Sequence, residues 1–309
     1  MKMSLTIILP SLNKKRSKYL QHSQSTKDKM KALSELGFSS REIAKLVLGS
    51  ETKKSSVNRV LASEGTTSKP KKDAEDNSRI LFISDLHIPF HHEDSFDFLR
   101  HLKQKYNPTR VICLGDELDK NSLSYHEKNP DLYSPGHELQ VSIPFIHELE
   151  EIFPKMDILE SNHGSLVWRK AKTFGIPKHY IKSYNDVLGV DSGWKWSFDL
   201  TINLPNGQKC YVHHGKTSNV IQLSQQMGMC AVQGHFHESF KIDYWGNPTG
   251  LYWGMQCGCL IDDDTMAFNY NNVNIKRPII CTGLVIDSMP ILEPMILNSE
   301  GRWVGAKSA

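Results

Sequence analysis

Near its middle the chain contains the stretch Ile112-Cys113-Leu114-Gly115-Asp116-Glu117-Leu118-Asp119, in which an apolar run meets an acidic cluster. The short, continuous run from Val111 to Gly115 predicts a buried β-strand. A hard cation could bind at the end of such a strand, where Asp116 is the first carboxylate. Many folds contain one strand that ends this way, so the meaning of this one depends on the other strand ends.

Four further strand-like runs also end in His, Asp or Asn. The first, 79–84, continues into Asp85-Leu86-His87, and side chains two residues apart in an extended chain can face one ion. A predicted helix over 94–105 connects this run to 109–114, and the resulting β-α-β unit places both acidic ends at one edge of a sheet. The remaining runs, 156–160, 208–212 and 230–233, end in Asn162-His163, His213-His214-Gly215 and Gly234-His235-Phe236-His237.

Taken in order, these five strand ends resemble the motifs of the calcineurin-like metallophosphoesterases, and the resemblance covers residues 79–260. It implies an α/β fold, a two-sheet α/β sandwich, with two divalent metal ions bound at the strand ends. The resemblance assigns one ion to Asp85, His87, Asp116 and His237, and the other to Asp116, Asn162, His214 and His235. Asp116 would then bridge the two ions.

The donor types suit such a site on chemical grounds. Carboxylates can bridge two cations, imidazoles are borderline-soft ligands, and a neutral amide adds no charge. This mixture favours manganese, with iron, zinc or magnesium as alternatives, over calcium. Two adjacent ions would lower the pKa of a bridging water and align it for in-line attack on phosphorus. The resemblance makes His163 a catalytic residue and not a ligand, one that contacts phosphate or protonates the leaving oxygen.

The sequence departs from the family pattern around His163. Ser161 and Gly164 stand where the family usually has a glycine and an acidic residue. Another group, such as Asp85 or Asp119, would therefore have to orient the imidazole. Asp119 is expected to support the site and not to bind metal.

Further residues near the motifs are candidates for other roles. Arg169 and His126 are predicted to bind substrate, Arg169 because a guanidinium pairs bidentately with phosphate and His126 because it follows the acidic loop. Trp168 could stack on a base. His213 is expected to face away from the metals, because the family motif is His-Gly and therefore selects His214.

Residues 26–63 have apolar residues at spacings of three and four, which predicts three short amphipathic helices. Ser39 and Glu42 form a capping box at the start of the second helix, and Gly49 ends it. Residues 35–44 resemble the helix-turn-helix of resolvase-like and sigma-factor-like DNA-binding domains. In that arrangement the third helix would enter the major groove, with DNA contacts expected from Lys53, Lys54, Ser56, Asn58 and Arg59. A three-helix bundle used for oligomerisation would have the same periodicity.

The charge of this region favours DNA binding. Residues 1–78 contain 16 Lys or Arg and 8 Asp or Glu, a net charge of +8, whereas the formal net charge of the whole chain is +3. We therefore expect a basic tail (1–24), a small all-α helix-turn-helix domain (25–64), a polar linker (65–78) and a metallophosphoesterase domain (79–309). Within the last, four short runs between residues 240 and 296 predict a second sheet.

The spacing of the cysteines and the length of the apolar stretches indicate the cellular compartment. The six cysteines have no C-x-x-C spacing and are expected to be reduced and buried. No stretch approaches the ~20 apolar residues of a membrane span. We therefore expect a soluble, cytoplasmic protein with no membrane partner.

The sequence thus predicts a metal-dependent phosphodiesterase that cuts DNA, with the helix-turn-helix bringing the catalytic domain to its substrate. The architecture is similar to that of phage-encoded phosphoesterases and nucleases, for which the location would be the host cytoplasm. Two alternatives stay open. One is a phosphatase or cyclic-nucleotide phosphodiesterase, because one fold serves many substrates. The other is a non-catalytic DNA-binding regulator, which would need none of the seven candidate ligands.

Overall fold

The computed structural model describes residues 22–36, 38–63, 75–125, 133–262 and 277–305. The chain forms two compact units, residues 1–74 and 75–309, so the boundary between them falls inside the predicted linker. Nearly all of the predicted basic tail lies outside the described residues, and so does His126.

The first unit is a bundle of three helices, α1 (Gln24–Glu35), α2 (Ser40–Leu48) and α3 (Lys54–Ser63), with a 3₁₀ turn, η1 (Glu51–Lys53), before α3. The predicted capping box is present: the Ser39 hydroxyl accepts from the Glu42 N–H, and the Glu42 carboxylate accepts from the Ser39 N–H at 2.8 Å. Gly49 ends α2 in the left-handed conformation, as predicted. The apolar spacing buries one face of each helix in a common core of Met30, Ile43, Ala44, Val57, Val60 and Leu61.

The second unit contains a six-stranded sheet in the order β11-β10-β1-β2-β3-β4. Its strands are β1 (Arg79–Ile83), β2 (Arg110–Cys113), β3 (Met156–Leu159), β4 (Trp194–Ser197), β10 (Cys281–Ile286) and β11 (Met289–Pro294). β1 to β4 are parallel, so their carboxyl ends lie at one edge. The crossover helices are α4 (Ser95–Tyr106) and α5 (Pro135–Ile152). α5 begins at Pro135 because Ser134 caps it and Pro135 occupies its first turn.

A five-stranded sheet has the order β5-β6-β7-β9-β8. Its strands are β5 (Leu200–Asn203), β6 (Lys209–His213), β7 (Cys230–Gln233), β8 (Phe240–Asn247) and β9 (Gly250–Cys257), with α8 (Val220–Met227) between β6 and β7. The prediction that all four late apolar runs form this sheet is wrong for two of them. β10 and β11 instead complete the first sheet, where β10 pairs with β1. A strand's local pattern shows which face is buried but does not identify its partner.

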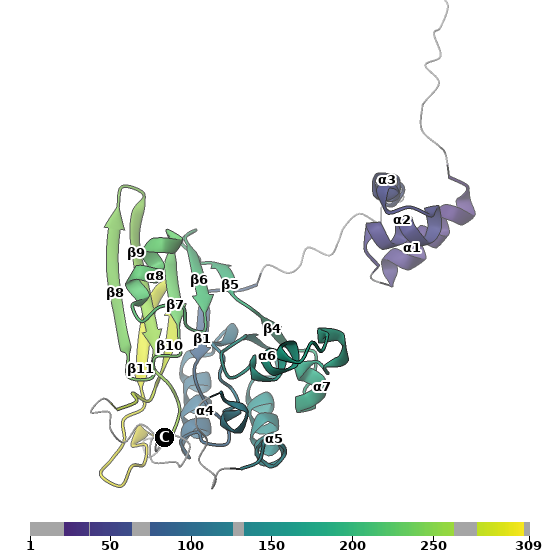
Figure 1. The fold of residues 1–309 in the computed structure, drawn as a ribbon. Helices are drawn as coiled ribbons and strands as arrows, with labels where there is room; N and C mark the ends of the chain where they lie inside the picture. Colours follow the sequence, from purple (N-terminus) through teal and green to yellow (C-terminus); the bar gives the residue numbers. More distant parts are fainter. Residues whose placement is uncertain (1–21, 37, 64–74, 126–132, 263–276, 306–309) are drawn as a thin grey trace, which may run out of the picture. The chain divides into compact units, whose positions relative to one another are not determined.

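Two connections of the first sheet contain short helical elements. One of them, η2 (Asn121–Leu123), follows β2. The other connection joins β3 to β4 through α6 (Leu166–Thr173), η3 (Lys178–Tyr180) and α7 (Tyr184–Leu188), which lie near β4 (Figure 1). The second connection contains the Asn162-His163 motif, which lies between β3 and α6.

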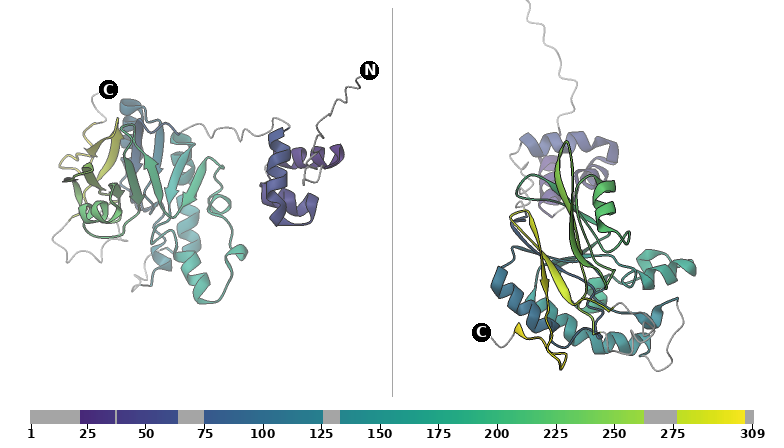
Figure 2. Two further views of the ribbon diagram at one scale, coloured as in Figure 1. Left: turned by 90° about the horizontal axis from the view of Figure 1, so that it is seen from above. Right: turned by 90° about the vertical axis from the view of Figure 1, so that its left-hand side faces the viewer.

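Side chains that alternate along the strands build two cores. Along β1, Leu81 and Ile83 face the core under α4 and α5, whereas Ile80 and Phe82 face the second sheet. α8 covers the other face of the second sheet, where Leu223 is buried. The unit therefore has four layers, helices, sheet, sheet and helix, which confirms the predicted two-sheet α/β sandwich (Figures 1 and 2).

All six cysteines are buried and free, as predicted. Burial raises the pKa of the Cys113, Cys210 and Cys281 thiols well above the usual value, which keeps them protonated and unreactive. Among the described helices, none is both long and apolar enough to cross a membrane.

Asp94 links the start of α4 to the last described residues. Its carboxylate accepts from Arg302 Nε at 2.9 Å and from the Trp303 N–H at 2.8 Å. Hydrogen bonding from Arg302 lowers the Asp94 pKa from 3.8 to about 2. Because the pKa is lowered by folding, the stabilisation is complete above about pH 4 and is lost as the pH falls toward 2.

We expect Asp94→Asn to lower the free energy of unfolding in urea by about 1–3 kcal/mol at pH 7, since it removes a charged partner from a partly buried hydrogen-bond network. Glu93→Gln is the matched control. Glu93 also pairs with Arg302, at 3.1 Å, but its side chain is 65% exposed. Equal losses in the two variants would contradict the role assigned to Asp94.

Candidate metal centre

Polar side chains from both sheets meet where the strands end. The first sheet contributes Asp85 and His87 after β1, Asp116 after β2, and Asn162 and His163 after β3; the second contributes His214, His235 and His237 after β6 and β7. Three groups of candidate donors have ligand atoms within 4.8 Å of one another: Asp85, His87 and His237; His87, Asp116 and His163; and Asp116, His214 and His235. Five strand ends that are far apart in sequence therefore form one cluster.

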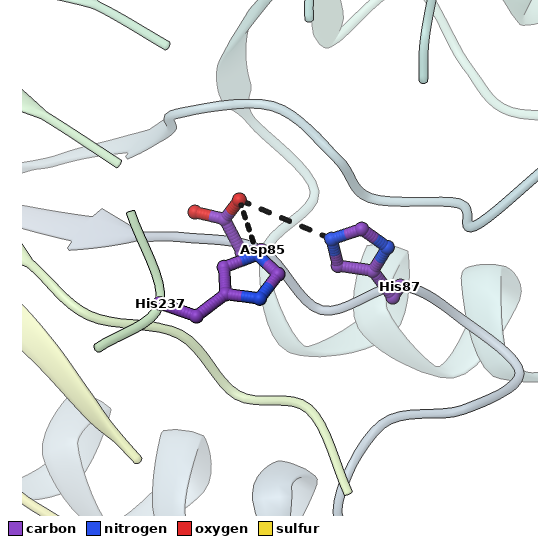
Figure 3. Close-up of side chains that lie close together, drawn as sticks. All are labelled: Asp85, His87 and His237. Atoms are coloured by element: carbon purple, nitrogen blue, oxygen red, sulfur yellow. Dashed lines mark hydrogen bonds and ion pairs between the residues drawn. The ribbon is translucent and has the colours of Figure 1, made fainter. Parts of the chain in front are cut away.

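Asp85, His87 and His237 point toward one another (Figure 3). Asp85 Oδ1 lies 3.2 Å from His237 Nε2 and 3.9 Å from His87 Nε2. His87 Nε2 is also 3.5 Å from Asp116 Oδ2. Atoms that bind one ion at about 2.1 Å are themselves about 3–4 Å apart. These spacings fit a single divalent ion.

A second set of donors surrounds His214. Its Nε2 lies 3.3 Å from Asp116 Oδ2, 2.6 Å from Asn162 Oδ1 and 3.2 Å from His235 Nδ1. This set also fits one ion. Asp116 Oδ2 lies within 3.5 Å of a nitrogen from each set, so Asp116 is the residue positioned to contact both ions.

Groups behind the candidate ligands fix the imidazole rings. Asp119 Oδ1 contacts His87 Nδ1 at 2.8 Å, and the Leu114 carbonyl accepts from His214 Nδ1 at 3.0 Å, which leaves Nε2 of each ring directed at the cluster. The Asp119 carbonyl also accepts from His163 Nδ1. Asp119 thus contacts two histidines, one through its carboxylate and one through its backbone.

The backbone at the strand ends is strained. Four candidate ligands have positive φ angles of 51°, 49°, 51° and 71°: Asp85, His87, Asp116 and His235. Each such residue costs about 1–2 kcal/mol relative to ordinary backbone. The approach of the two sheets is also close, because a Cβ at Gly234 would lie 2.0 Å from Ser84 Oγ and 2.5 Å from Asp85 Oδ2. Strain concentrated on candidate ligands is typical of a functional site.

Carboxylates and imidazoles shift one another's pKa. Burial would raise the pKa of Asp116, but His214 and His163 outweigh it and hold that pKa well below the usual range. Burial likewise opposes the charge on His214, but Asp116 raises its pKa to about 9. His235 shifts the other way, because burial and the nearby His214 lower its pKa. Imidazole binds metal only when neutral, so metal binding would displace protons from this cluster.

Two buried amides support the second-sheet histidines, and sequence reasoning did not identify them. Gln256 Nε2 donates to the Gly234 carbonyl at 2.6 Å, and Gln233 Nε2 donates to Gln256 Oε1 at 2.9 Å. Both side chains are fully buried, so they fix the turn that carries His235. Gln233 could have been recognised because it directly precedes the Gly-His motif, whereas nothing local marks Gln256.

Two residues near the motifs lie outside the cluster. His213 Nδ1 accepts from the Gly215 N–H, so His214 is the histidine of this pair that faces the cluster. Arg169 is exposed, with its guanidinium over the Tyr125 ring at 5.2 Å and Nη1 3.5 Å from the Asn162 carbonyl. Its predicted contact with phosphate stays a prediction.

The residues predicted to contact DNA lie in the first unit, around the start of α3: Lys53, Lys54, Ser56, Asn58 and Arg59. All except the half-buried Ser56 are exposed. Lys53 Nζ donates to the Leu48 carbonyl at 3.0 Å and so also caps the end of α2.

The number of metal ions bound by a variant can distinguish a residue that bridges two ions from one that binds a single ion. We expect the full chain to bind two Mn²⁺ ions in a calorimetric titration. Asp116→Asn should weaken both by more than about 100-fold, since even a group behind a ligand contributes about 10–100-fold. Asn162→Ala should weaken only one, and Asp191→Asn, a change at an exposed carboxylate, should weaken neither. Loss of a single ion in Asp116→Asn would contradict the bridge.

Comparisons with known proteins identify similar structures only. No family model matches the chain, and no curated protein matches it. A phosphoesterase from E. coli, YfcE, has a TM-score of 0.38 and 13% identity over 73% of this chain and 96% of its own. Vps29 from Chaetomium thermophilum has a TM-score of 0.41 and 9% identity over 73% of this chain and 93% of its own. The Pseudomonas putida nuclease MPE has a TM-score of 0.31 and 12% identity over 70% and 86%. Similarity at this level carries no argument about activity, which must be inferred from the site.

Proposed function

We propose that the protein is a metal-dependent phosphoesterase that hydrolyses phosphodiester bonds in DNA. The proposal rests on the cluster around Asp116, in which two sets of buried or half-buried donors share one carboxylate and His163 lies beside them. Two divalent ions bound there would supply Lewis acidity and a nucleophile at neutral pH. This is the chemistry implied by the resemblance to calcineurin-like metallophosphoesterases.

His163 is placed to act on the leaving group. Its Nδ1–H donates to the Asp119 carbonyl, and its backbone N–H donates to Asp116 Oδ1 at 3.2 Å, so the ring is anchored at two points. Its ring lies edge-on to that of His87, with the centroids 4.7 Å apart. In the protonated imidazolium form of the ring, the second nitrogen, Nε2, also carries a hydrogen and can give it to the leaving oxygen.

The activity can be tested with Mn²⁺ and a panel of substrates: plasmid and oligonucleotide DNA, bis(p-nitrophenyl) phosphate, p-nitrophenyl phosphate and a cyclic nucleotide. We expect cleavage of DNA and of the small diester. His163→Ala should lower kcat by about 10²–10⁴-fold, the usual contribution of general acid catalysis.

His137→Ala is the matched control, since His137 is an exposed histidine at the start of α5. Hydrolysis confined to the monoester or the cyclic nucleotide would contradict a nuclease. It would instead support a phosphatase or a cyclic-nucleotide phosphodiesterase. DNA cleavage that survives in Asp116→Asn would rule out the proposed centre, and no hydrolysis of any substrate would favour a regulator.

The first unit supports DNA as the substrate. α3 exposes Lys54, Asn58 and Arg59, whereas Val57 and Val60 are buried in the core of the bundle. Exposed cations beside polar side chains on one helix are suited to contacts with phosphates and base edges. The net charge of +8 over residues 1–78 adds a general attraction to a polyanion.

We expect the double variant Lys54→Ala/Arg59→Ala in the full chain to weaken binding to duplex DNA. Each lost phosphate contact should also lower the slope of log affinity against log salt by about 1. Fluorescence anisotropy at several salt concentrations measures both effects. Lys31→Ala, on the exposed surface of α1, is the control. An unchanged affinity and slope in the double variant would show that α3 does not contact DNA.

A further inference from the structure

The connection that follows His163 is strongly basic. Residues 166–182, here called the basic aromatic segment, span α6 and η3 and contain five Lys or Arg but no Asp or Glu: Arg169, Lys170, Lys172, Lys178 and Lys182. None of these five cations pairs with a carboxylate of the described residues. The rest of residues 79–309 has an excess of acidic groups. Positive charge is therefore concentrated in this segment.

Aromatic rings lie exposed among these cations. Phe174 is 80% exposed and Tyr180 75% exposed, and nearby Phe198 is 61% exposed. Phe174 follows the last turn of α6 and Tyr180 belongs to η3, and these two elements are in contact. A single exposed ring needs no explanation, but several rings beside unpaired cations form a surface that stacks on bases and attracts phosphates.

A cavity of about 940 Å³ lies beside the segment. Its aromatic lining includes Trp168, Tyr184, Trp196 and Phe198. Its charged lining consists of three cations, Lys120, Lys178 and Lys182, and two carboxylates, Glu138 and Glu160. The Tyr184 and Trp196 rings are stacked, with centroids 5.3 Å apart. The volume lies within the range of small-molecule sites and is large enough for a nucleotide.

Two residues that line the cavity contact the residue next to the candidate catalytic histidine. Lys120 Nζ and the Tyr184 hydroxyl both donate to the Gly164 carbonyl, at 3.4 and 2.9 Å, and Gly164 directly follows His163. Lys120 also follows Asp119, whose carbonyl holds the His163 ring. A nucleotide in the cavity would therefore place its phosphate near the turn that carries His163.

Given the proposed phosphodiesterase activity, on which this step rests, we propose that the basic aromatic segment and its cavity bind single-stranded DNA and present it to the metal centre. Exposed rings can stack only on bases whose faces are free, and in a duplex those faces are covered by neighbouring base pairs. The five cations would contact the backbone of the strand. The substrate class is thus an unpaired strand or strand end, and duplex DNA would be bound by the first unit.

Binding can be measured in EDTA, which separates it from catalysis. The double variant Phe174→Ala/Tyr180→Ala in the full chain should weaken binding of a fluorescent oligo(dT), because each base stack contributes about 1–3 kcal/mol, or about 5–150-fold. Binding of a blunt-ended duplex annealed from two complementary strands should be unchanged. Tyr244→Ala is the matched control, since Tyr244 is a 50% exposed ring on β8. Unchanged oligo(dT) affinity, or equal loss for the duplex, would overturn the inference.

Hydrolysis provides the second readout. The double variant should raise KM for a single-stranded oligonucleotide and leave the turnover of bis(p-nitrophenyl) phosphate unchanged, because both substituted side chains are exposed and outside the metal cluster. Equal loss on both substrates would show a general structural effect and overturn the inference. If the wild-type chain hydrolyses no phosphoester, the proposed function fails, while selective loss of oligo(dT) binding in EDTA would still support the strand-binding surface.

Discussion

Asp85 and Asp116 are carboxylates with essentially no solvent exposure, placed at the ends of the neighbouring strands β1 and β2. Each buried charge costs several kcal/mol unless opposite charge or hydrogen bonds compensate it. The second sheet contributes to the compensation through His214, His237 and the His235 N–H, which donates to Asp85 Oδ2 at 2.9 Å. The packing of the apolar core between the sheets therefore also brings the imidazoles that follow β6 and β7 to the carboxylates that follow β1 and β2.

The close approach of imidazoles to carboxylates leaves little room for larger side chains at the ends of the strands. Gly115 has φ of 103°, and a Cβ there would lie 2.7 Å from Ser161 Cβ and 2.8 Å from the Leu159 carbonyl. Backbone hydrogen bonds reinforce the crossing, since the His87 N–H donates to the Asp116 carbonyl at 2.8 Å. Donor atoms held by crossing backbones cannot move apart independently. The crossing backbones therefore hold the donor atoms in place, which lowers the cost of assembling the site.

Features encoded locally could be predicted from the sequence, and features that depend on distant partners could not. Asp85 and Asp116 were identifiable because a buried strand and its polar end are contiguous. The assignment of β10 and β11 failed because strand pairing is not local. α6 was not predicted, because its eight residues span only about two helical turns. The stacking and cation contacts of this connection likewise depend on residues far away in sequence.

The cations of the second unit fall into two groups by their partners. Arg302 pairs with Asp94, and Arg110 lies 2.7 Å from Asp157, so their charges are neutralised within the fold. Arg169 contacts an aromatic ring and a carbonyl, neither of which carries a net charge. Cations without a carboxylate partner repel one another and do not stabilise a fold. They do raise the local concentration of an anionic ligand. Buried aspartates alone would repel phosphate from the metal centre. The basic connection that follows His163 would offset that repulsion, because Lys120 and Tyr184 of the cavity wall contact Gly164 beside His163.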